Sequence, residues 1–211
     1  MKRFLLILIV IIITLSIVLV GVGCTTTAAV QTTKAEFVGS DFELSLPEKW
    51  EGGRKDELDP IIKNLKEMGQ EQLAEQVEAS LSTFLFWGYD TETAASGGNV
   101  STFNITGDSS AAFLSLNKYM DLSYKNVEKV YEKAGYTFNI IEEDVVPIGN
   151  YEEVGRTIFE QTVEGVKTKV AQYIIKNGSD FWVLTFTAGL EQFDQDMQAF
   201  DKTIETFKII E

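Results

Sequence analysis

The second half of this 211-residue chain carries four successive segments with the composition and spacing of β-strands. They comprise residues 137–146, 153–163, 166–176 and 180–188, and each is rich in β-branched and aromatic side chains. Short turn sequences join them, and the last is Asn177-Gly178, where both residues tolerate a positive φ. Strands joined by such hairpins pair in chain order, so the sequence predicts an antiparallel meander.

Two segments with apolar residues at helical spacing flank this meander. Residues 113–134 place apolar or aromatic side chains three and four positions apart, and Gly135 follows as a helix-ending residue. Residues 193–207 show the same spacing. Strands and amphipathic helices in this order predict an α+β fold, in which helices flank a central antiparallel sheet.

Shorter elements are expected in the first half of the chain. Residues 42–46 alternate as a strand does, and Pro47 ends the run. Asp59-Pro60 has the pattern of an N-cap followed by the first residue of a helix. Apolar stripes on either side of Gly69 predict two short helices or one kinked helix.

Further along, the aromatic residues 83–90 and the segment 99–106 are expected to form two more strands, with a loop at 91–98 between them. We expect Gly52-Gly53 to form a turn, because no phosphate-binding glycine motif surrounds it. Ser109 is expected to begin the long helix.

The N-terminus has the pattern of an export signal. Met1-Lys2-Arg3 is basic, residues 4–20 are almost wholly apolar, and Gly21-Val22-Gly23 precedes Cys24. Gly21-Val22-Gly23-Cys24 resembles the lipobox of bacterial lipoproteins, which implies an acylated Cys24, with chains such as palmitate, as the mature N-terminus. An uncleaved signal anchor and an exported protein with a free thiol are the alternatives.

The chain therefore divides into a signal peptide at 1–23, a lipidated cysteine with a flexible Thr/Ala-rich linker at 24–35, and one domain at 36–211. Cleavage before Cys24 removes Lys2 and Arg3 and changes the formal charge from −14 to −16. Anionic headgroups repel such a surface, so the domain is expected to stand away from the bilayer on its tether. The predicted location is the extracytoplasmic face of the cell membrane.

Composition excludes several classes of function. The chain has no histidine and one cysteine, which excludes a Ser-His-Asp triad, a histidine-ligated metal and an intrachain disulfide. An acidic chain is a poor nucleic-acid binder. The carboxylate clusters at 56–59, 142–144 and 194–196 lack the spacing of a calcium loop and are interpreted as solvated surface. We therefore expect no cofactor, no metal and no catalysis, although an enzyme that uses carboxylates alone stays open.

Aromatic side chains give the candidate binding residues. Trp87 and Tyr89 lie in one predicted strand, and Phe181 and Trp182 lie in another. Helices that cover both sheet faces would make these residues part of the core. Otherwise they would line a surface or groove for a protein partner or an apolar ligand, because tryptophan is enriched at binding hot spots.

The opening Phe42-Glu43-Leu44-Ser45-Leu46-Pro47-Glu48-Lys49-Trp50 resembles the first strand of PsbP-like proteins. The ending is similar too, with a strand before Asn177-Gly178, the aromatic strand after it and a final helix. This resemblance implies an α/β/α sandwich around a central antiparallel sheet over residues 36–211, in a superfamily that includes many bacterial lipoproteins. Metal-binding histidines of its photosynthetic members have no counterpart here.

The expected function is that of a lipid-anchored, non-catalytic interaction or assembly module for an unidentified protein partner. The alternative is a carrier of a small apolar ligand or lipid, held between sheet and helix.

Overall fold

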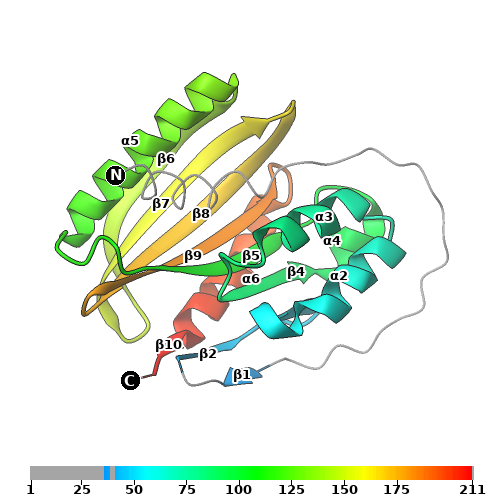
Figure 1. Ribbon diagram of the computed structural model, residues 1–211, viewed down its shortest axis with the longest axis horizontal. Coiled ribbons are helices and arrows are strands. Elements are labelled where there is room, and N and C mark those ends of the chain that lie inside the picture. The colour runs from blue at the N-terminus through cyan, green and yellow to red at the C-terminus, as the bar shows by residue number, and fades with distance from the viewer. Residues whose placement is uncertain (1–35, 39–40, 211) are drawn as a thin grey trace.

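The computed structural model describes residues 36–38 and 41–210. Its main feature is a seven-stranded sheet in the order β3-β4-β5-β9-β8-β7-β6, in which every neighbouring pair is antiparallel. The strands are β3 (Trp50–Arg54), β4 (Phe86–Asp90), β5 (Thr102–Asp108), β6 (Thr137–Ile148), β7 (Tyr151–Val163), β8 (Val166–Asn177) and β9 (Asp180–Gly189). Helices lie on both faces (Figure 1), so the predicted α+β class and layer order are confirmed. The predicted signal, Cys24 and the linker lie outside the described residues.

The predicted meander is confirmed as β6 to β9. Glycines at the second position of two hairpin turns have positive φ, 85° at Gly165 and 59° at Gly178. Strand β9 continues the sheet by pairing with β5, so that Thr102 lies opposite Thr187 and Asp108 opposite Phe181. The C-terminal meander and the N-terminal half of the chain thereby form one sheet.

Two segments that were expected to be a turn and a loop belong to regular elements. The expected turn at Gly52-Gly53 is wrong, because both residues belong to β3. Gly52 faces Gly88 across the ladder, and a Cβ at Gly52 would lie 2.7 Å from the Phe86 ring, so the glycine admits that ring. The expected loop at 91–98 is also wrong, since α4 (Thr91–Ser96) fills most of it. The Asp90 carboxylate caps α4 by accepting from the backbone N–H groups of Glu92 and Thr93.

The helices contain the predicted rows of apolar residues, but they begin at other residues than predicted. A 3₁₀ turn, η1 (Lys55–Glu57), leads into α2 (Leu58–Glu67), so Asp59 lies inside the helix and does not cap it. Gly69 has a φ of 78° and interrupts the helix before α3 (Glu71–Ser80). Of the two alternatives, two short helices are therefore observed. Helix α5 (Leu116–Ala134) is capped by Ser115, and the expected start at Ser109 is therefore wrong.

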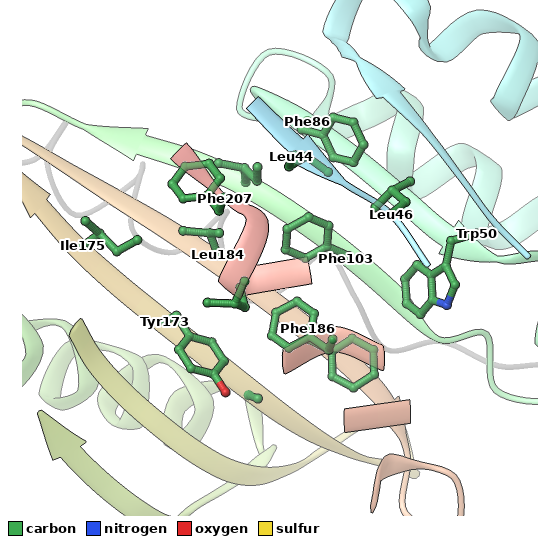
Figure 2. Close-up of a cluster of buried hydrophobic side chains, with 14 of the residues drawn as sticks. Leu44, Leu46, Trp50, Phe86, Phe103, Tyr173, Ile175, Leu184, Phe186 and Phe207 are labelled. Carbon is green, nitrogen blue, oxygen red and sulfur yellow. The ribbon is translucent and has the colours of Figure 1, made fainter. Parts of the chain in front are cut away.

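One face of the large sheet is closed by α6 (Phe193–Thr206) and by a small sheet of β1 (Glu36–Val38), β2 (Phe42–Ser45) and β10 (Lys208–Ile209). The side chains between these layers are largely aromatic and form the core shown in Figure 2. Phe186 lies at its centre, 4.6 Å from the Phe200 ring and 5.8 Å from the rings of Trp50 and Phe193. We call this side of the sheet the α6 face.

The opposite face carries two separate helical covers, and we call it the split face. Helices α2 and α3 pack Leu58, Ile62 and Val77 onto the aromatic side chains of β4. Helix α5 packs against β7, β8 and β9 through a second cluster (Figure 1). Between the two clusters lie the central strands β5 and β9, whose side chains on this face are mostly polar. Within residues 36–38 and 41–210, no helix is both long and apolar enough to span a bilayer.

Candidate functional site

A row of directly opposed side chains crosses the split face from one helical cover to the other. Trp87 on β4 pairs with Asn104 on β5, which pairs with Thr185 on β9 and then with Gln172 on β8. Directly opposed residues in an antiparallel ladder point to the same face, so these four side chains form one line. We call this line, together with its neighbours Thr102 and Thr106 on β5 and Thr187 on β9, the polar row.

At the end of the polar row next to α5, Gln172 and Thr185 are hydrogen-bonded. The Tyr124 hydroxyl of α5 donates to Gln172 Oε1 at 2.9 Å, and Gln172 Nε2 donates to Thr185 Oγ1 at 3.0 Å. Burial raises the pKa of Tyr124, so its hydroxyl stays protonated and acts as the donor in this chain of bonds. These contacts tie α5 to the sheet.

The middle of the polar row lacks such partners. Asn104 is completely buried, yet neither its Oδ1 nor its Nδ2 makes a hydrogen bond within the described chain. The same is true of the Trp87 indole Nε1 and of the hydroxyl groups of Thr102, Thr106 and Thr187. Leaving a buried polar group unpaired costs about 1–3 kcal/mol. Five such side chains lie together on β4, β5 and β9, which makes the row a candidate site.

Trp87 and Tyr89 were candidates either for the core or for a binding surface, and the structure places both rings in the core. The two rings stack at 5.6 Å beneath α2 and α3, and both residues are fully buried. The Tyr89 hydroxyl donates to Glu51 Oε2 at 2.8 Å, and burial raises its pKa. An open aromatic patch is therefore not present here; of the two residues, only the indole N–H of Trp87 reaches the polar row unpartnered.

Phe181 and Trp182 were predicted as a pair, and the structure separates them onto opposite faces. Phe181 is fully buried on the split face, where it stacks on Tyr119 of α5 at 3.9 Å. Trp182 is half-buried on the α6 face, 6.0 Å from the rings of Phe42 and Phe207. Consecutive strand residues alternate in direction, so the two cannot form one surface.

Two carboxylates approach each other near the end of β4. Burial raises the pKa of Asp90, and the nearby Asp196 of α6 raises it further. Burial also raises the pKa of Asp196, which accepts a 2.5 Å hydrogen bond from Ser101 Oγ. Each carboxylate thus has a structural partner: Asp90 caps α4 and Asp196 joins α6 to the chain entering β5. In the described ranges, no group of three or more carboxylate or thiol side chains is arranged to hold a metal ion.

The carboxylates at 56–59 and 142–144 are exposed, as expected, but the expectation for 194–196 is only half right, because Asp194 is exposed and Asp196 is half-buried. Glu142 lies 2.8 Å from Arg156 and Asp194 lies 3.5 Å from Lys169, and the two carboxylate side chains are about half and nine-tenths exposed, respectively. A groove of about 470 Å³ runs beside α6 and is open to solvent. Its lining comes from the β2–β3 connection and α6: Ser45, Leu46, Pro47, Glu48, Gln195, Gln198, Ala199, Lys202, Thr203 and Thr206.

No family model matches the chain, and no curated protein matches it in sequence. Similarity appears in solved structures. Cyanobacterial PsbP (CyanoP) from Synechocystis sp. PCC 6803 superposes with a TM-score of 0.54 at 9% identity, over 89% of this chain and 97% of its own. LpqN of Mycobacterium tuberculosis, described as involved in cell envelope biogenesis, gives 0.44 at 12% identity over 85% and 91% of the two chains.

The immunity protein TplEi of the Pseudomonas aeruginosa T6SS, in complex with a peptide, gives a TM-score of 0.46 at 8% identity over 85% of this chain and 99% of its own. At sequence identities this low, the similarity shows only that the backbones are arranged alike. Coverage of nearly the whole CyanoP chain, with the same central antiparallel sheet and flanking helices, shows that this chain has the PsbP-like fold.

Proposed function

We propose that this chain is a non-catalytic binding protein, held on the extracytoplasmic face of the membrane by lipid on Cys24, which holds its ligand on the polar row. The observation that carries the proposal is Asn104, a fully buried amide with neither polar atom paired in the described chain. An unpaired buried amide destabilises the fold, and a bound group that supplied the missing partners would offset this cost.

Binding without catalysis fits the chemistry of the row. Its unpartnered groups are hydroxyl, amide and indole N–H groups, and none of them titrates near neutral pH. The two carboxylates with raised pKa, Asp90 and Asp196, lie on the opposite side of the sheet and already have hydrogen-bond partners. The two carboxylates whose pKa is raised are thus separated from the polar row by the sheet.

An apolar carrier fits less well. On the α6 face, the gap among Leu46, Trp50, Phe103 and Phe200 has no room for even one water molecule. On the split face, an apolar ligand would leave the Asn104 amide unpaired. Neither the packed core of the α6 face nor the polar row therefore offers a lipid tail a suitable place.

The test compares the full chain, extracted from its membrane in detergent, with its Asn104→Leu variant. A deproteinised small-molecule extract of the source cells should raise the melting temperature of the wild-type chain and leave the variant unchanged. Asn139→Leu, the same substitution on the exposed strand β6, is the matched control and should respond as the wild type does. Equal responses in all three proteins would remove the proposal.

The anchor is tested separately. Cys24→Ser should release the domain from the membrane or leave an unprocessed precursor, and intact mass should show acyl chains on Cys24 of the wild-type protein. Unchanged processing and membrane retention in the variant would contradict lipid attachment without touching the ligand site.

A second candidate function, docking of a protein partner, is favoured by the edge strand β6. Three of its apolar side chains are exposed, Ile140, Ile141 and Val145, and they accompany the acidic Glu142, Glu143 and Asp144. A long edge strand with apolar side chains can accept a partner strand. Crosslinking in intact cells should then capture a partner that Ile141→Lys loses and that Asn104→Leu retains.

A further inference from the structure

We propose that the outer edge of β6 binds an extended, basic segment of another protein as an added strand of the large sheet. This inference rests on the second function proposed above, docking of a protein partner at β6, and names the chemistry of that partner. It is drawn from the position of β6 in the sheet, its exposed side chains and the sign of its charges.

The two end strands of the large sheet, β3 and β6, differ in how far they are covered. Strand β3 has five residues, of which Trp50 and Gly53 are buried, and both η1 and α2 contact it. Strand β6 has twelve residues, nine of them exposed and the others half-buried (Figure 1). Alternate backbone N–H and C=O groups of an end strand point away from the sheet. Among the described residues no strand pairs with that side of β6, so its edge can accept one.

Exposed apolar side chains accompany this open edge. Ile140, Ile141 and Val145 are 38%, 44% and 42% exposed, respectively. The described chain exposes only three other large apolar side chains to this extent, so half of them fall within one stretch of six residues. A cluster of exposed apolar groups is typical of a surface that a partner covers.

Two irregularities of β6 define where a partner strand fits. Ile141 is the extra residue of a β-bulge, because the pairing with β7 passes from Ile140 directly to Glu142. A second interruption falls at Pro147. Bulges and prolines restrict pairing at the edges of natural sheets. Here they bound residues 142–146, which pair with β7 without interruption and have the length of a common strand.

The stretch 142–146 carries three carboxylates and no cation. Glu143 lies opposite Thr157 on the split face, and its neighbours Glu142 and Asp144 point to the α6 face. Arg156 of β7 lies 2.8 Å from Glu142 and 3.9 Å from Asp144. One guanidinium group among three carboxylates leaves the edge negative. An added strand places its side chains directly opposite these carboxylates, where opposite charges attract, so the edge favours a basic partner.

A second copy of the chain fits this edge poorly. In an antiparallel pair of β6 strands centred on Glu143, the two Glu143 side chains would face each other, and Glu142 of each copy would face Asp144 of the other. Like charges directly opposite destabilise a pair of strands. The formal charge of −14 adds repulsion between two copies and attracts a basic segment. The acidic edge therefore discriminates against self-association and in favour of a cationic strand.

The edge also specifies the order of side chains in the partner. An antiparallel strand needs apolar residues opposite Val146 and Val145, followed by three cations opposite Asp144, Glu143 and Glu142. The probe is therefore a peptide with blocked ends that contains two valines, three lysines and one isoleucine in this order. A peptide with glutamate in place of lysine is the charge control. A lysine peptide with every amide N-methylated keeps the charge but has no backbone donor.

Titration calorimetry of the full chain in non-ionic detergent at low salt should show binding of the lysine peptide and not of the two control peptides. Amide hydrogen exchange should slow at residues 142–146 on binding and stay unchanged in β3, since added backbone hydrogen bonds protect only the edge that they cover. Slower exchange at β6 separates strand addition from attraction between side chains alone.

Variants separate this edge from the general acidity of the chain. The triple variant Glu142→Gln, Glu143→Gln and Asp144→Asn should weaken binding of the lysine peptide about tenfold, since three exposed charge pairs are lost. A matched triple variant changes one aspartate and two glutamates that are exposed on α2 and α3, at the other end of the sheet: Asp59→Asn, Glu71→Gln and Glu75→Gln. It has the same net charge and should bind as the wild type does.

Four results would overturn the inference: no binding of the lysine peptide, equal binding of either control peptide, an equal loss in both triple variants, or dimers of the full chain that Ile141→Lys abolishes. If the crosslinking described above still captures a partner that depends on Ile141, a protein docks at β6 by other chemistry and only the basic strand is excluded. If no such partner is captured either, docking at β6 falls as well. The ligand proposed for the polar row is tested independently by the cell extract.

Discussion

The two faces of the large sheet are covered by helices in different ways. The α6 face is one continuous aromatic layer, in which Phe186 contacts the rings of Trp50, Phe193 and Phe200. The split face has apolar clusters only at its two sides, and polar side chains such as Asn104 and Thr187 fill the centre. The α6 face thus has one continuous apolar cluster, whereas the split face divides its apolar burial among separate clusters with polar side chains between them.

The largest effect should come from the α6 face. Phe186→Ala removes a fully buried ring from the centre of the aromatic layer and leaves a cavity that its rigid neighbours cannot close. The free energy of unfolding should fall by about 3–5 kcal/mol, measured by urea unfolding. A loss below about 1 kcal/mol would show that the aromatic layer can repack around the missing ring.

A smaller loss is expected at the bonded end of the polar row. Gln172→Leu removes the acceptor of the Tyr124 hydroxyl and the donor to Thr185, and leaves both groups buried without partners. The free energy of unfolding should fall by about 1–3 kcal/mol. Tyr124→Phe combined with Gln172→Leu should recover part of this loss, because the double variant no longer buries an unpaired hydroxyl on α5.

At Asn104 on β5, two strands from Gln172, we expect a change in the free energy of unfolding of the opposite sign. Asn104→Leu replaces an amide of similar size whose polar atoms have no partner, so ligand-free protein should be unchanged or more stable by about 1 kcal/mol. Comparing it with Gln172→Leu under identical urea conditions tests the distinction between the two parts of the row. If both variants lose the same stability, Asn104 is paired in solution and the row is uniform.

The smallest expected change in stability is its dependence on pH through Asp196 of α6. Burial raises the pKa of Asp196 above its ordinary value of 3.8, so the folded state prefers the protonated acid. The stabilising contribution is therefore present below that ordinary value and is lost as the pH rises through the folded-state pKa. Asp196→Asn keeps an acceptor for Ser101 and removes this titration.

The Asp196→Asn variant should consequently show a flatter decline of stability with rising pH than the wild type, measured by thermal unfolding from pH 3.5 to 7. Asp194→Asn, two residues away on an exposed and weakly paired side chain, is the matched control. Parallel curves for wild type and Asp196→Asn would show that burial does not shift this group.

The meander and the covering helices could be predicted because hairpin turns and helical stripes are local signals. Local signals also explain the errors. Gly52-Gly53 has the composition of a turn, and only the Phe86 ring on the neighbouring strand explains why glycine is needed within a strand. The loop expected at 91–98 became a helix because the Asp90 side chain caps it.

The candidate site could not be found from the sequence. Thr102-Phe103-Asn104-Ile105-Thr106 alternates as a half-exposed strand does, which places its polar residues in solvent. They are buried because β5 is a central strand that pairs with β9, a contact between distant parts of the chain. The sequence indicates Trp87 as a binding residue through its aromatic ring, whereas the atom without a partner is its indole nitrogen.

The pairing of β5 with β9 also constrains the order in which the molecule can fold. Thr102 finds its partner only when Thr187 is available, so a chain that emerges from its N-terminus exposes the open edge of β5 until nearly all of it has emerged. Long-range pairing of this kind slows folding, since the intervening segment must be ordered first. Because the last hairpin lies at the centre of the sheet, residues 180–189 complete the fold, and β5 has an open edge until they pair with it.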